Sequence, residues 1–310
     1  MAAERRFTAM GTTAHVLVHG DEALLDLAQA EVERLEAAWS RFRPTSEVSR
    51  LNDAGGRWVA VSPDTVLLVE RAILASVVTE GRFDPTVLGD VIRAGYDRDF
   101  ALVAARDAAS PSPASPLRRG VDGIEVDAAH GAVRLPAGTG FDPGGIGKGL
   151  AADLVAGRLD AEGAAGALIN LGGDLRAVGY GPDGDDWAIE LDPAASGLPL
   201  ATVSLERGAI ATSTTLRRRW ELDDEVRHHL IDPATGRPAV GDLVAASVLA
   251  AHGWQAEVLA KAALVAGLEA GLTLVERLGA DALLVDRHGA LHRAAGFARF
   301  EISRTKEAIA

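Results

Sequence analysis

The chain has 310 residues, of which 48% are hydrophobic and 24% charged, so it can bury a large core and form one or two compact lobes. Its formal net charge of -13 disfavours a nucleic acid or an anionic membrane as a partner, because the summed field of the protein would repel both. Cysteine is absent, which excludes disulfides, thiolate catalysis and cysteine-ligated zinc.

The chain contains no apolar run long enough to cross a bilayer, so membrane insertion is not expected. Residues 1–6 lead directly into a strand-like segment, with no apolar signal region and no lipobox cysteine. The chain as given is therefore expected to be cytoplasmic, or else already trimmed.

The first elements have clear periodicity. Phe7–His19 carries alternating and β-branched residues and predicts a strand with Met10 near its start. Asp21–Trp39 repeats apolar residues at helical spacing, with Asp21 as a plausible cap. Ser40–Asn52 mixes basic, hydroxyl and aromatic residues outside any period, which fits a binding loop, a short helical turn or a solvated connector.

A second amphipathic helix is expected at Pro63–Glu80, with Ser62 as its cap and Gly81 at its end. The following residues, Gly81–Val87, place an aromatic side chain and an acid beside Pro85. Considered alone, this segment favours an ordinary turn. Residues 108–116 are rich in Ala, Ser and Pro and predict a flexible surface connector.

The most distinctive stretch is Asp142–Leu150, in which four glycines and one proline occur within nine residues. From Leu150 onward the residues favour a helix, so we expect a tight loop that opens into one. Free amides at a helix start, the helix dipole and Lys148 together form an anion site suited to a phosphate or pyrophosphate. A purely structural turn stays an equal alternative.

Two familiar nucleotide motifs fit this loop poorly. A Walker A loop needs Ser or Thr directly after Gly-Lys, whereas Gly149 follows Lys148 here. A dinucleotide fingerprint places its glycines in a first βαβ unit, whereas these lie in the middle of the chain.

The second half of the chain predicts mainly strands. The expected strands are a hairpin within 121–135, a strand at 167–175 that runs into a Gly-Gly turn, and strands at 187–191, 201–205, 209–215, 247–250 and 282–286. A helix is expected at 255–265, where Glu257 and Lys261 lie four residues apart and most simply form a surface ion pair.

A second dense group of polar residues is Arg227–Pro238, which contains His228, His229 and an Asp before Pro233. Zinc-type spacing is missing, because adjacent histidines on a strand point to opposite faces. One of the two histidines can therefore face a site.

Taken in order, six blocks of this sequence resemble the ApbE family, the FAD:protein FMN transferases. The blocks are Met10–Thr12, Ser40–Asn52, Gly81–Thr86, Asp142–Asp153, Ile169–Gly173 and His229–Pro238. The family uses FAD and magnesium to attach FMN through a phosphoester to a Thr or Ser of an acceptor protein. The resemblance implies an α+β, T-fold-like architecture with mainly antiparallel sheets and packed helices. It further implies a single unit over residues 1–310, with two intimately packed lobes and FAD in the cleft between them.

The resemblance also assigns roles to individual residues. The residues it places against the flavin or adenine are Met10, Phe42, Arg82, Phe83 and Asp84, although the family often has Tyr where Phe42 stands. Asp142 and Lys148 would contact FAD from the glycine loop, and Ile231 from the histidine block. His229 matches the histidine proposed to take the proton of the acceptor hydroxyl, and Lys148 would assist catalysis beside the diphosphate.

The metal position departs from the family pattern. Magnesium is typically held by a loop carbonyl, here that of Gly145, and by an Asp and a Thr four residues apart, here Glu257 and Lys261. A lysine at a ligand position places a cation beside a cation, so we expect weakened magnesium binding. Two alternative functions follow: an FAD-binding protein with little or no transfer, or an FAD pyrophosphatase that yields FMN and AMP. The implied partners are FAD and an acceptor protein that the sequence does not name.

Overall fold

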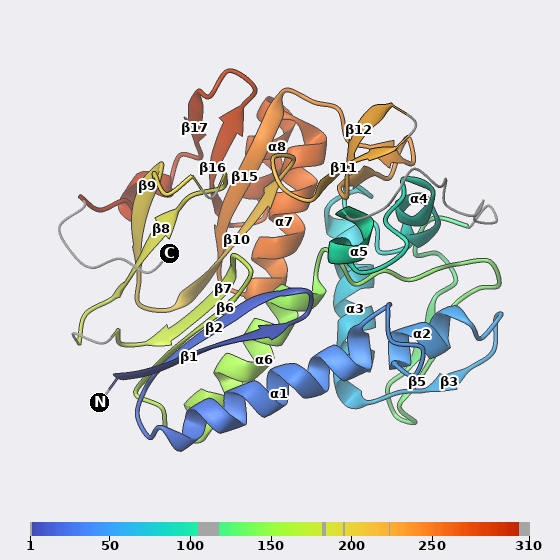
Figure 1. Cartoon of the computed structure of the whole chain (residues 1–310), viewed down its shortest axis with the longest axis horizontal. Helices are drawn as coiled ribbons and strands as arrows, with labels where there is room; N and C mark the ends of the chain where they lie inside the picture. Colours follow the sequence, from blue (N-terminus) through green and yellow to red (C-terminus); the bar gives the residue numbers. More distant parts are fainter. Residues whose placement is uncertain (1, 105–117, 182–183, 195, 223, 304–310) are drawn as a thin grey trace. The chain divides into compact units, whose positions relative to one another are not determined.

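The computed structural model describes residues 2–104, 118–181, 184–194, 196–222 and 224–303 (Figure 1). The chain divides into two compact units. Unit 1 comprises Met1–Arg34, Lys148–Thr214 and Asp242–Ala310, and unit 2 comprises Leu35–Gly147 and Thr215–Gly241. The connector predicted at 108–116 lies outside the described residues, and the intimate packing of two lobes stays a prediction.

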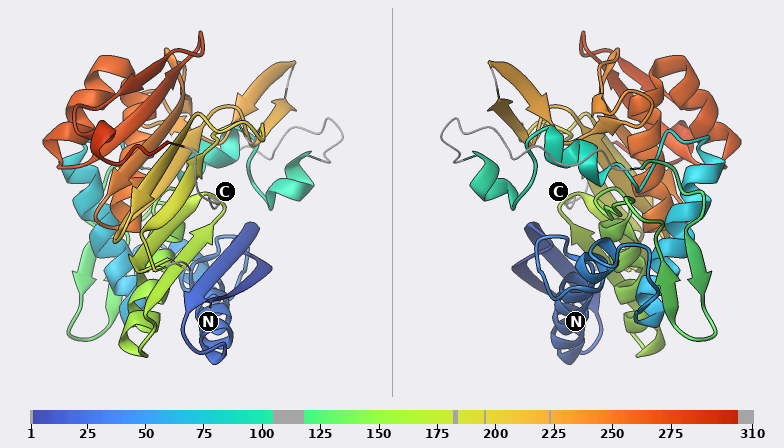
Figure 2. Two further views of the ribbon diagram at one scale, coloured as in Figure 1. Left: turned by 90° about the vertical axis from the view of Figure 1, so that its left-hand side faces the viewer. Right: turned by 90° about the vertical axis from the view of Figure 1, so that its right-hand side faces the viewer.

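Unit 1 is built on an eight-stranded sheet in which all neighbouring strands are antiparallel. In sheet order the strands are β1 (Ala2–Ala9), β2 (Thr12–His19), β6 (Gly166–Leu171), β7 (Asp174–Gly179), β10 (Gly208–Thr214), β15 (Leu243–Ala250), β16 (Asp281–Asp286) and β17 (Leu291–Arg293). Figure 2 shows the twist of these strands from two opposite sides, each turned by 90° from Figure 1.

Other elements cover both faces of this sheet, which explains why β6 and β15 are apolar at nearly every position. A hairpin of β8 (Trp187–Leu191) and β9 (Ala201–Leu205) packs on one face through Trp187 and Val203, together with the short helix η1 (Phe297–Arg299). Helix α7 (Gly253–Ala266) packs on β10 and β15 at the other face, where Ala256 contacts Ala209 and Ala211. The other helices with residues in unit 1 are α1 (Ala23–Trp39), α6 (Gly147–Ala161) and α8 (Leu268–Arg277).

Unit 2 combines short helices with small sheets. Its elements are α2 (Glu47–Asn52), α3 (Pro63–Val78), α4 (Leu88–Arg93), α5 (Phe100–Ala104), a sheet of β3 (Val59–Ala60), β5 (Ala132–Arg134) and β4 (Glu125–Asp127), and the pairs β11 (Arg219–Leu222) with β12 (Glu225–His228) and β13 (Ile231–Asp232) with β14 (Arg237–Pro238). Their core gathers Val87, Val91, Tyr96, Trp220 and Ile231. The mixture of helices with antiparallel sheets confirms the predicted α+β class.

Local signals predicted several elements well. Helix α3 begins after Ser62, whose hydroxyl accepts a hydrogen bond from the amide of Thr65, and Pro63 occupies the first turn as expected. The strands at 187–191 and 201–205 also form as predicted and pair with each other.

Two predicted elements differ in the structure. The single strand expected at Phe7–His19 is a hairpin, because Met10 and Gly11 both adopt positive φ angles, of 50° and 65°, and reverse the chain between β1 and β2. Helix α6 begins at Gly147 and not at Leu150, so Lys148 lies within its first turn.

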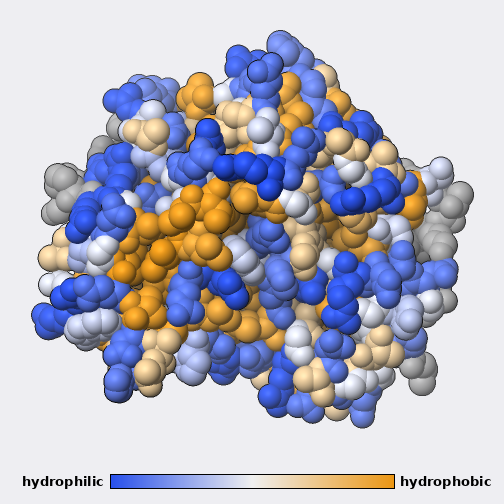
Figure 3. Space-filling view, turned by 180° about the vertical axis from the view of Figure 1, so that it is seen from behind, coloured by the Kyte–Doolittle hydropathy of each residue, from blue (hydrophilic) through white to orange (hydrophobic). Residues whose placement is uncertain are grey.

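The surface keeps some apolar side chains. Val77 of α3 is 64% exposed and Leu74 is 40% exposed. Seen from behind, hydrophobic residues gather on one face with hydrophilic residues around them (Figure 3). Within the described ranges, every helix is too short or too polar to cross a membrane.

Candidate active site

The first group of candidate residues surrounds Lys148 in unit 1. Its ammonium is ion-paired with Asp174 at the start of β7, and Nζ also lies 3.0 Å from Oε1 of Glu257 on α7. Both carboxylates are buried, with Asp174 only 4% and Glu257 only 5% exposed. Two buried acids therefore hold one cation at the first turn of the helix that follows the glycine loop.

The close approach of α6 and α7 makes this arrangement possible. A Cβ atom on Gly149 would overlap the carbonyl oxygen of Gly253, and one on Gly253 would overlap the carbonyl oxygen of Gly149. The amide of Gly149 donates a hydrogen bond of 2.8 Å to Oε2 of Glu257. Glycine at both positions lets the two helix starts meet through their backbones.

Asp153 on α6 stabilises the same contact between the starts of α6 and α7. Its carboxylate accepts hydrogen bonds from the amides of Gly253 (2.8 Å) and Trp254 (3.0 Å), so it caps α7 from a neighbouring helix. Arg176 lies 3.2 Å away and also donates to the carbonyl of Ala251. Burial raises the pKa of Asp153, although the two amide hydrogen bonds and Arg176 oppose the shift.

Glu257 and Lys261 do not form the exposed pair that their spacing indicated. Both side chains are buried, Lys261 with only 8% exposure, because this face of α7 turns toward the interior of unit 1. Glu257 uses one oxygen for the amide of Gly149 and the other for Lys148. The surface interpretation was therefore wrong, and the acid belongs to the Lys148 cluster.

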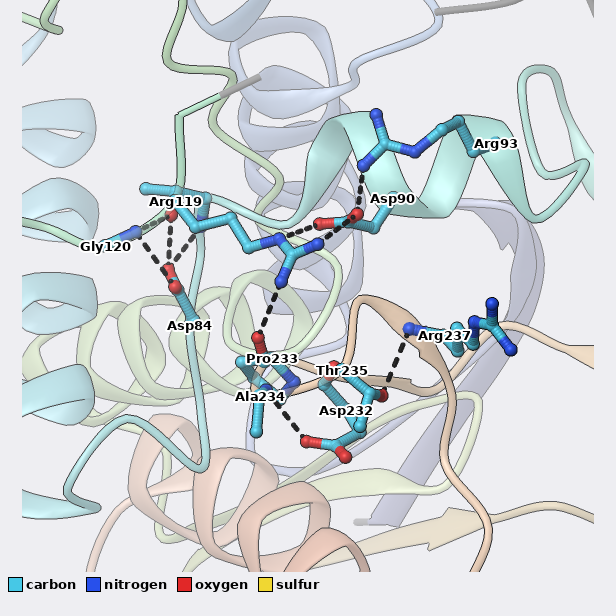
Figure 4. Close-up of polar contacts among 11 residues, drawn as sticks. Asp84, Asp90, Arg93, Arg119, Gly120, Asp232, Pro233, Ala234, Thr235 and Arg237 are labelled. Carbon is cyan, nitrogen blue, oxygen red and sulfur yellow. Dashed lines mark hydrogen bonds and ion pairs between the residues drawn. The ribbon is translucent and has the colours of Figure 1, made fainter. Parts of the chain in front are cut away.

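The second group of candidate residues lies in unit 2, around the Asp84 loop (Figure 4). Oδ1 of Asp84 accepts hydrogen bonds from the amide (2.8 Å) and hydroxyl (2.6 Å) of Thr86. The carbonyl of Pro85 accepts the amide of Asp142 at 2.7 Å, which ties this loop to the glycine loop. The amide of Gly120 donates to Oδ2 of Asp84 and to the Thr86 hydroxyl, at 3.1 and 2.7 Å.

Asp142 is held near a buried arginine. Nε of Arg41 lies 3.7 Å from Oδ1 of Asp142, and the two side chains are only 9% and 12% exposed. The same guanidinium stacks 4.2 Å from the ring centre of Phe42 and 4.6 Å from that of Tyr96. Phe42 remains 38% exposed, so one aromatic ring stays available to a ligand. Burial raises the pKa of the Tyr96 phenol.

The histidine block also lies in unit 2. His229 follows β12 and is half-buried, with its Nδ1 atom inside the protein. The next two residues are held in a hairpin. The carbonyl of Leu230 accepts a hydrogen bond of 2.9 Å from the amide of Ala239, and the fully buried Ile231 pairs with Pro238. Burial lowers the pKa of the adjacent His228.

The other predicted FAD contacts lie in turns. Met10 is in the β1–β2 turn of unit 1. Arg82 is 35% exposed at its side chain and pairs with Glu80 at 3.2 Å. Phe83 is 1% exposed, so its ring packs inside unit 2 and shapes the loop from within.

Several residues of the site were missed from the sequence. Asp174 directly follows the Gly-Gly turn, which could have marked it, since binding residues often lie on or beside loops. Arg41 lies in the predicted binding loop but had no distinguishing feature there. Arg119 had no local signal, because its partners Asp90 and Pro233 lie 29 and 114 residues away along the chain.

The donor set at the predicted metal position does not fit magnesium well. Among the described residues, no three His, Cys, Asp or Glu side chains are grouped in a way that could hold a metal ion. Both oxygens of Glu257 already accept hydrogen bonds, and Lys261 offers a cation where an oxygen ligand is required.

Comparison with known proteins places the chain in a family. Residues 10–284 match the ApbE family. An FAD:protein FMN transferase of Treponema pallidum is 32% identical over 272 residues, which cover 82% of this chain and 74% of that protein. Another from Vibrio cholerae is 31% identical over 279 residues and covers 86% of this chain and 82% of the relative.

Solved structures agree with this assignment. The crystal structure of the ApbE protein of Thermotoga maritima matches with a TM-score of 0.86 at 26% identity, over 98% of this chain and 100% of that one. The flavin transferase ApbE of Vibrio cholerae matches with a TM-score of 0.82 at 26% identity, over 97% of this chain and 99% of that one. The predicted ApbE-like fold is confirmed, and the chain belongs to the ApbE family.

Proposed function

We propose that this chain is an FAD:protein FMN transferase, which moves FMN from FAD to a Thr or Ser hydroxyl of an acceptor protein and releases AMP. Membership of the ApbE family and relatives of that name at 31–32% identity support the proposal. The strongest structural support for this proposal is the ammonium of Lys148, which two buried carboxylates hold at the first turn of α6. A fixed cation at a helix start, directly after a glycine loop, suits a diphosphate.

We assign the FAD contacts to the residues that the resemblance indicates, namely Met10, Phe42, Arg82, Phe83, Asp84, Asp142, Lys148 and Ile231. Phe42 offers an exposed ring for stacking on the flavin or adenine. Phe83 and Ile231 are 1% and 0% exposed, so they contribute by holding the backbone of their loops. The Asp84 carboxylate is fixed by Thr86 and Gly120, which limits its motion around the ligand.

In the proposed reaction, His229 takes the proton of the acceptor hydroxyl as the hydroxyl oxygen attacks the phosphorus of the FMN half of FAD. A new phosphoester bond forms, the phosphoanhydride bond to AMP breaks, and AMP leaves. Lys148 stabilises the negative charge that develops on the diphosphate. The Asp174 and Glu257 carboxylates keep its ammonium in place throughout.

Magnesium is expected to bind weakly at Gly145, Glu257 and Lys261. Glu257 is already bound to Lys148 and to the Gly149 amide, so a metal would have to break these hydrogen bonds. Isothermal titration of magnesium into the FAD-loaded protein tests this part separately. A micromolar affinity would contradict it.

The transferase proposal is tested by incubating the protein with FAD, magnesium and an acceptor domain that carries a Thr. Denaturing gel electrophoresis then shows whether flavin fluorescence migrates with the acceptor. An acceptor in which that Thr is changed to Ala is the matched control and should show no flavin fluorescence. Release of free FMN, together with an acceptor that lacks flavin fluorescence, would favour an FAD pyrophosphatase. FAD that remains unchanged would favour a binding protein without transfer activity.

A further inference from the structure

Arg119 makes an unusually complete set of polar contacts in unit 2 (Figure 4). Its Nε lies 2.7 Å from Oδ2 of Asp90, and its Nη2 donates to Oδ1 of Asp90 at 2.9 Å. The Asp90 side chain is only 3% exposed. This two-point contact fixes the plane of the guanidinium, since both carboxylate oxygens are engaged at once.

The remaining nitrogen of Arg119 reaches the histidine block. Nη1 donates a hydrogen bond of 3.1 Å to the carbonyl of Pro233, which lies in the turn between β13 and β14. In that turn the amide of Gly236 donates to the carbonyl of Asp232 at 2.8 Å. The carboxylate of Asp90 thus holds the turn through Arg119.

Gly236 gives an independent sign that this contact is built into the fold. Its φ angle is +68°, and a Cβ atom there would overlap Nη2 of Arg119 and lie 2.7 Å from Oδ1 of Asp90. Only glycine allows the turn to pack directly against the ion pair.

The turn between β13 and β14 belongs to a hairpin that begins shortly after His229. It closes a hairpin in which Ile231 pairs with Pro238, and the amide of Ala239 donates to the carbonyl of Leu230 at 2.9 Å. His229 immediately precedes these two paired residues. A shift of the turn would therefore move the histidine.

The residue after Arg119 restrains a second part of the site. The amide of Gly120 donates to Asp84 and Thr86 in the loop assigned to FAD binding. We propose that Arg119 is a positioning residue, which holds the His229 hairpin through Pro233 while its neighbour Gly120 holds the Asp84 loop. This inference rests on the proposed function, and it adds a residue whose role is to align the general base.

Three variants separate this role from that of an ordinary ion pair. Arg119→Ala removes both contacts, to Asp90 and to Pro233. Arg93→Ala is the matched control, because Arg93 is also ion-paired with Asp90 and is exposed to a similar extent, 37% against 35%, while this ion pair lies within α4 itself. Arg119→Lys is a conservative variant that keeps the charge and lacks the planar guanidinium.

The first measurement is hydrogen exchange of the amides at residues 229–239, which does not depend on catalysis. We expect Arg119→Ala to speed exchange there about 10-fold relative to Arg93→Ala, since the loss of one charge-assisted hydrogen bond changes local opening by about that factor. Equal exchange in the two variants would overturn the inference, even if the wild-type protein transferred no FMN.

The second measurement is FMN transfer kinetics on the wild-type protein and the three variants. In Arg119→Ala we expect kcat to fall about 100-fold while KM for FAD changes less than about threefold, because a misplaced base affects the reaction more than binding. Added guanidinium ion should restore part of the rate in Arg119→Ala, and Arg119→Lys should lie between it and the wild type. A loss of rate that accompanies lost FAD binding, without rescue by guanidinium, would overturn the positioning role. An inactive wild-type protein would instead contradict the proposed function and leave the exchange result to decide this inference.

Discussion

The amide nitrogen of Gly149 lies 2.8 Å from Oε2 of Glu257, so the start of α6 is hydrogen-bonded to a buried carboxylate one turn inside α7. This contact joins the glycine loop segment to the predicted metal residue. It also explains why Glu257 faces inward and why Lys148, next to Gly149, finds a partner there.

Gly149→Ala should strongly destabilise the protein, because the added methyl would overlap the carbonyl of Gly253 and lie 2.8 Å from the amide of Trp254. We expect a loss of about 3 kcal/mol in the free energy of unfolding. Gly157→Ala is the control on the same helix. A Cβ there meets no atom within 4 Å, so this variant should gain about 0.5–1 kcal/mol from helix propensity. Urea denaturation measures both, and equal stabilities would contradict the close contact.

Lys148→Met should weaken both folding and FAD binding. It leaves the buried carboxylates of Asp174 and Glu257 without their shared cation, which costs about 3–5 kcal/mol. Quenching of flavin fluorescence should report an FAD affinity at least about 10-fold lower. Arg158→Met removes an exposed ion pair from the same helix and should leave the affinity within about twofold of the wild type. If the two variants bound FAD equally well, Lys148 would have no part in the diphosphate site.

His228 should make the stability of the fold depend on pH. In its neutral form Nε2 donates to the carbonyl of Ala239 at 3.1 Å, and Nδ1 accepts the amide of Leu230 at 3.3 Å. Burial lowers the pKa of His228 in the folded state, so the unfolded chain takes up its proton first as the pH falls. The contribution to stability is complete above about pH 6.5 and is lost as the pH falls through the lowered folded-state pKa.

Thermal melting between about pH 7.5 and 5 tests this expectation on wild type and His228→Gln. The variant should show a shallower decline toward acid, since glutamine carries no titrating group. His130→Gln is the control, because His130 is 81% exposed and lies far from the hairpin in sequence. Parallel curves for His228→Gln and the wild type would show that His228 is not the group responsible.

Magnesium binding at the predicted metal position can be tested by placing there the Asp and the Thr that the family resemblance implies. The double variant Glu257→Asp with Lys261→Thr replaces the long acid and the cation by two oxygen ligands. We expect it to bind magnesium about 10-fold more tightly than the wild type in the FAD-loaded state, measured by isothermal titration. Lys261→Met removes the charge without adding a ligand and serves as the comparison. An unchanged affinity in the double variant would show that these residues do not decide metal binding.

Helices and strands that are marked by nearby residues in the sequence were predicted correctly. The hydroxyl of Ser62 and the ring of Pro63 mark the start of α3, and alternating residues mark β8 and β9. The turn at Met10 was missed because a non-glycine residue adopts a positive φ angle there. Such an angle depends on the pairing of β1 with β2 and has no sequence signature of its own.

The site could be predicted only as a set of separate blocks. Lys148 is 26 residues from Asp174 and 109 from Glu257, and Arg119 is 114 residues from Pro233. Neither periodicity nor a motif encodes these pairings, because they arise from how the helices and sheets pack. The family resemblance supplied candidate residues, whereas the partners that hold them emerged from the structure.

The most direct measurement follows both products of the proposed reaction. The protein is incubated with FAD and a Thr-bearing acceptor domain, and the AMP released is quantified alongside the intact mass of the acceptor. We expect one AMP for each acceptor that gains one FMN, and neither product when His229 is changed to Asn. AMP accompanied by free FMN and an acceptor of unchanged mass would contradict it.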